Sequence, residues 1–173
     1  MLPDRQLDLF AGGGVPVPVI APRPSLVASA LDDAALIAAL PEATQGTCQD
    51  LTGEAAKRRL ARAIPALEVL CRRFKGFGLA HSVPEQMAAV RAIAAIGGRD
   101  AAAALARIIL DHVVQGPGLD TVLRAAARLR QRLPETLLPD LLRHPDPAVR
   151  ADAAGLRTPA APRRCCAAGR SAG

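Results

Sequence analysis

Apolar residues recur along most of this chain with the spacing of an amphipathic helix. In residues 84–96, for example, Met87, Val90, Ile93 and Ile96 fall on one helical face. Short turns rich in glycine, proline and polar residues separate such windows. The pattern predicts helices over residues 25–40, 54–74, 84–96, 100–114, 119–133, 137–143 and 147–156, whereas residues 42–53 are polar and show no clear period.

Several expected helix boundaries depend on single residues. Asp32 and Asp33 provide a start inside the first window, and Pro41 ends that window. Pro65 either kinks the second predicted helix or begins another one. Asp100 is expected to cap the helix that follows the Gly97-Gly98 turn.

The composition supports an all-α fold. Hydrophobic residues make up 50% of the 173 residues, but the aromatic residues are only three Phe, with no Trp or Tyr. Alanine is the best helix former and contributes little to a sheet, so the core must be built from aliphatic side chains on closely packed helices. A chain of this length suits one domain, which we assign to residues 25–157.

The segment from Leu137 to Ala154 has a defined helix–turn–helix pattern. A leucine-rich helix ends near His144, Asp146 is placed to cap the next helix, and Pro147 occupies its first position. This joint resembles the HEAT and HEAT-like (PBS-lyase-type) repeat, in which a D-P turn precedes V-R-x-x-A-A. The resemblance implies an α-solenoid of antiparallel helix pairs.

An internal echo is consistent with repeats. Arg91, Arg124 and Arg150 each lie in an apolar-R-A-x-A sequence. The spacing between them suits two-helix solenoid units, although the alanine-rich middle copy could be a coincidence. By similarity to HEAT arrays, such arginines are expected to reach acids or carbonyls of the adjoining unit.

Residues 1–24 are expected to form a flexible leader, because Gly12-Gly13-Gly14 and several prolines would interrupt a helix or a central strand. Within this leader lies the pentapeptide Gln6-Leu7-Asp8-Leu9-Phe10, whose large apolar side chains have no core of their own.

This pentapeptide resembles the motif by which bacterial replication and repair proteins dock on the β sliding clamp. The resemblance implies that Gln6 hydrogen-bonds the rim of the clamp groove, Leu7 anchors the peptide, Asp8 faces solvent, and Leu9 and Phe10 fill the apolar pocket. A disordered segment can bind through a few buried anchors. Alternatively, Leu7, Leu9 and Phe10 fold back onto the first helix of the domain.

The helical pattern stops after Leu156, and residues 158–173 are rich in Pro, Ala, Arg and Gly. They are expected to be either a natural disordered tail or the end of a shortened repeat array. The cysteines, Cys48, Cys71, Cys165 and Cys166, show no metal-ligand spacing and are expected to be reduced thiols in a cytoplasmic protein.

No segment of the sequence predicts catalysis, a cofactor or a membrane span. His81, His112 and His144 could form a line in stacked units, but one histidine per unit is too widely spaced for a shared metal ion. No serine lies in a nucleophile elbow, and the glycine run lacks the lysine of a phosphate loop. No apolar run approaches the roughly 20 residues of a membrane helix.

One basic cluster lies inside the predicted fold, and it could follow a nucleic-acid backbone or form a solvated helix face balanced by Glu54 and Glu68. Its members are Lys57, Arg58, Arg59, Arg62, Arg72, Arg73 and Lys75. Some HEAT-like proteins are DNA glycosylases, but the absence of Trp and Tyr argues against a base-excision enzyme.

The sequence therefore predicts a non-enzymatic, cytoplasmic interaction scaffold that holds protein partners on its surface and is tethered to the sliding clamp by its leader. Two alternatives remain at this point: a nucleic-acid-binding or DNA-repair module that uses the basic cluster, and an inert fragment of a longer repeat protein.

Overall fold

The structure, a computed structural model, describes residues 27–78 and 80–157. All regular secondary structure in these residues is helical, which confirms the all-α prediction. The helices are α1 (Asp33–Ala39), α2 (Cys48–Lys57), α3 (Ile64–Arg73), α4 (Pro84–Ile96), α5 (Gly98–Leu110), α6 (Leu119–Arg128), α7 (Leu138–Leu142) and α8 (Pro147–Arg157). Short 3-10 turns lie at Ala28–Ala30, Leu40–Glu42, Ala61–Ala63 and Gly116–Gly118.

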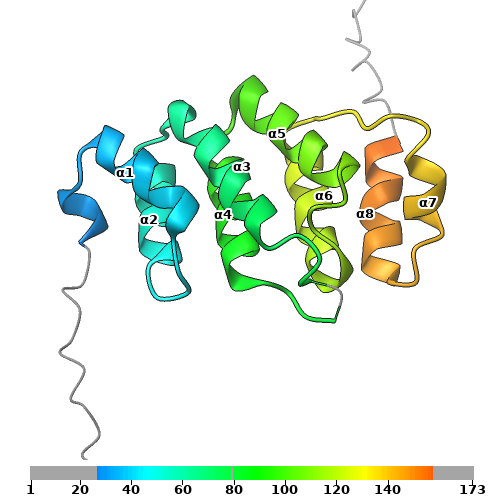
Figure 1. Ribbon diagram of the computed structural model, residues 1–173. Coiled ribbons are helices and arrows are strands. Elements are labelled where there is room, and N and C mark those ends of the chain that lie inside the picture. The colour runs from blue at the N-terminus through cyan, green and yellow to red at the C-terminus, as the bar shows by residue number, and fades with distance from the viewer. Residues whose placement is uncertain (1–26, 79, 158–173) are drawn as a thin grey trace, which may run out of the picture.

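The helices stand side by side in a row that runs from α1 to α7 and α8 (Figure 1). From α3 onward they alternate in direction, and α3 packs on α4, α5 on α6 and α7 on α8. The even-numbered helices also contact one another in order, since α2 packs on α4, α4 on α6 and α6 on α8. Helices α3 and α5 contact each other on the opposite side. The even-numbered helices therefore form one layer, and α3 and α5 belong to the other.

The core lies between these layers and is aliphatic. Leu67, Leu70, Ile93, Leu105 and Leu123 have no solvent exposure. Each such side chain contributes about 2 kcal/mol of hydrophobic free energy. Fully buried alanines on the same helices allow close approach between neighbours, so the few aromatic residues of this chain are not needed to fill the core.

A buried glutamine joins three elements of the core. Gln86 on α4 is 1% exposed, and its Nε2 donates hydrogen bonds to the carbonyl oxygens of Cys71 and Val113 at 3.1 and 3.0 Å. These bonds hold the end of α3 and the segment after α5 against α4. Buried polar groups of this kind need such partners, because an unpaired carbonyl would cost free energy.

Two predicted helix starts are confirmed by hydrogen bonds. A side-chain oxygen of Asp32 accepts from the backbone N–H of Ala35 at 2.7 Å, and Asp146 accepts from the N–H of Ala148 at 2.8 Å. The latter bond closes the turn between α7 and α8, where Arg150 also donates to two carbonyls. Each cap stabilises its helix by about 1 kcal/mol.

In the first three helices, the prediction is wrong about the start of α2 and agrees with the structure at α1 and α3. Within residues 27–40, Asp32 is extended and separates a 3-10 turn from α1, so the helix starts inside the predicted window, as Asp32 and Asp33 indicated. Helix α2 begins at Cys48 instead of Glu54, so the segment considered indistinct is partly helical. The chain then leaves the helix at Arg59, whose φ is +52°. A second helix begins at Ile64 with Pro65 in its first turn, which confirms one of the two alternatives predicted for this proline.

The connection between α4 and α5 is unusually short. It consists of Gly97, which has a φ of +73°, and Gly98, with a φ of +86°, is already the first residue of α5. Residues with a side chain rarely adopt these angles, so glycine is needed at this corner. Asp100 therefore lies in the first turn of α5, two residues inside it, and the prediction that it caps the helix is wrong.

The proposed leader, residues 1–24, and the proposed tail, residues 158–173, lie outside the described residues, as do Cys165 and Cys166. The clamp-type pentapeptide Gln6-Leu7-Asp8-Leu9-Phe10 lies outside them too. Its docking role and the alternative in which it folds back both stay predictions.

Candidate functional site

A hollow of about 520 Å³ lies between α2 and α4. Gly53 and Ala56 line it from α2, and Ala88, Ala92 and Ala95 line it from α4. Small side chains of this kind favour the helix at every position except the glycine. They also leave the space between the two helices open, because none of them reaches across it.

A second hollow of about 280 Å³ lies between α4 and α6. The two hollows adjoin, since Arg91 and Ala95 on α4 line both of them. The second hollow is also lined by Arg124 and Arg128 of α6, over a floor of aliphatic and threonine side chains. We refer to the two hollows together as the arginine groove. Three successive helices of the even-numbered layer contribute to it.

The only charged residues that line the arginine groove are Arg91, Arg124 and Arg128, and all three are exposed. Arg124 forms ion pairs with Asp120 at 3.2 Å and with Asp152 at 3.4 Å. Within residues 27–78 and 80–157, Arg91 and Arg128 form no ion pair. The groove thus presents two positive charges that no described acid neutralises.

Of the three arginines in the repeated pattern, Arg124 bonds an acid on another helix. Its bond to Asp152 joins α6 to α8. Arg150 instead donates to the carbonyls of His144 and Pro145, both at 2.8 Å, in the turn before its own helix. Arg91 makes neither kind of contact with a described residue and faces the arginine groove.

Three arginines of the sequence-predicted basic cluster make contacts that join separate elements of the fold. Arg58 bonds Glu54 at 2.8 Å and Asp33 at 3.0 Å, and it also donates to the carbonyl of Leu31. These bonds tie α2 to α1 and to the segment before it. Arg73 donates to the carbonyl oxygens of Pro41 and Ala43.

The third member is Arg72, which belongs to an ion-pair cluster on the α3–α5 side. Glu68 is 8% exposed and accepts from Arg72 at 2.9 Å and from Arg107 at 2.7 Å, while Arg72 also bonds Asp111 at 2.6 Å. Burial works to raise the pKa of Glu68, but the hydrogen bonds from Arg107 and Arg72 outweigh it and lower that pKa. The hydrogen bond from Arg72 likewise lowers the pKa of Asp111.

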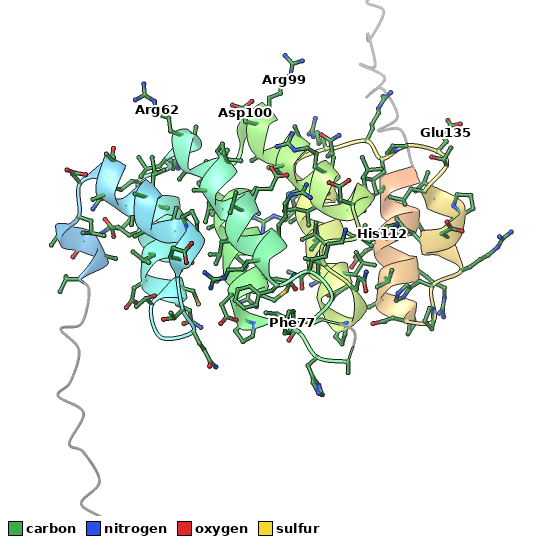
Figure 2. All side chains as sticks on the ribbon, in the orientation of Figure 1. Arg62, Phe77, Arg99, Asp100, His112 and Glu135 are labelled. Carbon is green, nitrogen blue, oxygen red and sulfur yellow. The ribbon has the colours of Figure 1, made fainter. Side chains whose placement is uncertain are left out.

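Lys57 is exposed but forms an ion pair with Glu54 at 3.6 Å. The remaining members, Arg59, Arg62 and Lys75, are exposed and do not share one location. Arg62 projects from the edge where α3 begins, whereas Phe77, just after Lys75, lies at the opposite edge (Figure 2). The cluster therefore extends along the whole of α3, and part of its charge is used within the fold.

The buried cysteines are poorly suited to nucleophilic chemistry. Burial raises the pKa of Cys71 to about 12 and also raises the pKa of Cys48. Both side chains therefore remain thiols at neutral pH.

The three histidines lie in separate turns: His81 precedes α4, His112 follows α5, and His144 follows α7. Only His144 makes a side-chain hydrogen bond that the structure records, since its Nδ1 accepts from the N–H of Asp146 at 3.1 Å. Across residues 27–78 and 80–157, no three His, Cys, Asp or Glu residues are grouped so that they could hold a metal ion.

Among the described helices, none is long and apolar enough to cross a membrane. No protein-family model, curated protein or solved structure matches this chain.

Arg91 and Arg124 were predicted to share a repeated pattern, but the sequence did not indicate that they line one site. Neither Arg128 nor the small lining residues of α2 were predicted to belong to it. The repeated apolar-R-A-x-A pattern could have indicated the site, because equivalent positions on successive helices of one layer face the same side.

Proposed function

We propose that this protein is a non-enzymatic interaction scaffold of the HEAT-like α-solenoid class, formed by residues 25–157 and working in the cytoplasm. A partner protein binds the face formed by α2, α4 and α6. The second role is that of the N-terminal pentapeptide, which tethers the scaffold to the bacterial β sliding clamp.

The observation that carries this proposal is the arginine groove. Three successive even-numbered helices line it, and two of its charges have no acidic partner among the described residues. Stacked helix pairs build extended surfaces of this kind, and their common use is to hold other macromolecules. Fold class alone does not define a partner, so the proposal depends on this surface.

Site-specific photocrosslinking tests the scaffold role. A benzophenone amino acid replaces Ala95, which lines both hollows, and in a control chain it replaces Asp100, which is exposed at the edge where α5 begins (Figure 2). In bacterial cells we expect a protein adduct from position 95 and none of the same mass from position 100. Equal adducts, or none at position 95, would contradict the scaffold role.

The tether is tested with purified β sliding clamp and the full chain. We expect binding that is lost when Leu9→Ala and Phe10→Ala are combined, because these side chains are the anchors that the motif implies. The matched control is Asp8→Ala, which alters the residue expected to face solvent and should bind like the unaltered chain. Binding that survives the double substitution, or that is absent from the unaltered chain, excludes the tether.

A further inference from the structure

We propose that the partner of the arginine groove is an acidic helical segment of another protein, in which a face of small apolar side chains is flanked by carboxylates. This inference rests on the scaffold function proposed above and specifies the chemistry of its partner. It concerns a face that is separate from the clamp-type pentapeptide.

The charges that line the groove favour an acidic partner. Every charged side chain that lines it is an arginine, and none is an acid. The acids that pair with Arg124 do not line the groove. Arg91 and Arg128, which form no ion pair with a described acid, lie on either side of the second hollow. A guanidinium binds a carboxylate through paired hydrogen bonds in a fixed plane, so carboxylates are the natural complement of these two residues.

The shape of the groove favours a helical partner. Much of its lining consists of small side chains on neighbouring helices, among them Gly53, Ala88, Ala92 and Ala125. Larger side chains, such as those of Met87 and Gln49, line it as well. An amphipathic helix binds such a surface by laying its apolar face into the groove. Alanine-sized contacts fit best here, because large side chains would hold the partner helix away from Arg91 and Arg128.

A nucleic-acid strand fits these residues less well. Base stacking needs aromatic side chains, and none lines the groove. A phosphodiester backbone brings a charge with every nucleotide, whereas the lining of the groove offers only Arg91 and Arg128 without an ion pair to a described acid. Asp120 and Asp152 beside Arg124 would repel additional phosphates. Two or three carboxylates match this limited charge.

Fluorescence anisotropy with the full chain provides the test. The probe is a labelled helical peptide with glutamates at every third or fourth position on one face and alanines elsewhere. A lysine version of the same peptide and a labelled single-stranded oligonucleotide serve as the other probes. We expect the glutamate peptide to bind, the lysine peptide not to bind, and the affinity to fall as salt is added.

The double variant Arg91→Glu with Arg128→Glu should weaken glutamate-peptide binding by about tenfold or more, since two attractive pairs become repulsive. Arg99→Glu is the control: it makes one charge reversal, half of the total change in the double variant, at the exposed edge where α5 begins (Figure 2). Its binding should stay within about twofold of the unaltered chain. Circular dichroism of each variant checks whether the helices are retained.

Three results would overturn the proposal: no binding of the glutamate peptide to the unaltered chain, equal losses in the groove variant and in Arg99→Glu, or tighter groove-dependent binding of the oligonucleotide. The last result would assign the groove to nucleic acid. If the glutamate peptide fails while position 95 still crosslinks to a protein, the acidic partner is wrong and the scaffold role stands.

Discussion

Arginines on the α3–α5 side of the molecule and arginines in the groove have opposite surroundings. On the α3–α5 side, Arg72 and Arg107 converge on the largely buried Glu68, and Arg72 also bonds Asp111. In the groove, Arg91 and Arg128 have no described acid within reach. Some arginines of this chain therefore hold helices together through ion pairs, whereas others are available to a partner.

We expect the greatest loss of unfolding free energy from a substitution that disrupts the ion pairs of Glu68. Glu68→Lys would place a third positive charge against Arg72 and Arg107, and removing a largely buried ionic partner in this way costs roughly 3 kcal/mol of unfolding free energy. The opposite reversal in the groove, Arg91→Glu, should change that free energy by less than about 0.5 kcal/mol. Urea unfolding followed by circular dichroism measures both variants, and similar losses would remove the distinction between the two faces.

A smaller effect comes from acid. The pKa values of Glu68 and Asp111 are lowered in the folded protein, so the native state binds fewer protons than the unfolded chain at acidic pH. Their stabilisation is complete above the unfolded carboxyl pKa of about 4 and is lost as the pH falls through the lowered values. We expect the unfolding free energy of Glu68→Gln to depend less on pH in this range than that of the unaltered chain.

Urea unfolding at a series of pH values from neutral to strongly acidic checks this expectation. Arg91→Gln is the appropriate control, since it removes no partner of an acid described in the structure and should follow the unaltered chain. Parallel curves for Glu68→Gln and the unaltered chain would mean that the cluster contributes nothing to the acid response.

The smallest effect concerns Arg124, which combines the two kinds of surroundings. Its side chain is 60% exposed, yet it bonds Asp152 of α8. Arg124→Ala should lower the unfolding free energy by at most about 1 kcal/mol, as for other exposed ion pairs, and less in high salt. Arg128→Ala on the same helix provides the comparison and should have almost no effect. A larger or salt-independent loss at position 124 would indicate packing instead of charge.

Much of the fold could be predicted where a helix boundary has its own local chemistry. The Asp146-Pro147 start of α8 and the Asp32 start of α1 form as expected, because the capping carboxylate and the fixed proline φ act within a few residues. The apolar spacing after Pro84 also predicted α4 with the correct bounds.

The missed start of α2 has a physical cause. Its buried residues include Cys48 and Thr52, and Thr52 is accommodated only because its hydroxyl donates to the carbonyl of Cys48 at 2.6 Å. The segment has few large apolar residues, so its sequence looks polar. Its burial comes from contacts with α4, which the sequence does not show. The positive φ of Arg59 that ends the helix region has no sequence signal either.

The candidate site could be predicted only in part. The repeated R-A-x-A pattern indicated that Arg91 and Arg124 hold equivalent positions, but which side they face depends on how α4 and α6 pack. Whether an arginine is neutralised depends on distant residues, such as Glu68 for Arg107 or Asp152 for Arg124. These pairings join separate helices, so a linear count of charges cannot reveal them.

The glycine corner between α4 and α5 has a mechanical consequence. With one residue between the two helices, and with α4 and α5 in contact with each other, the two helices have little room to move apart. Helix α4 forms the shared wall of the two hollows, and α5 packs against α6. We therefore expect a ligand that pushes α4 away from α2 to displace α5 and α6 as well, so that filling one hollow alters the width of the other.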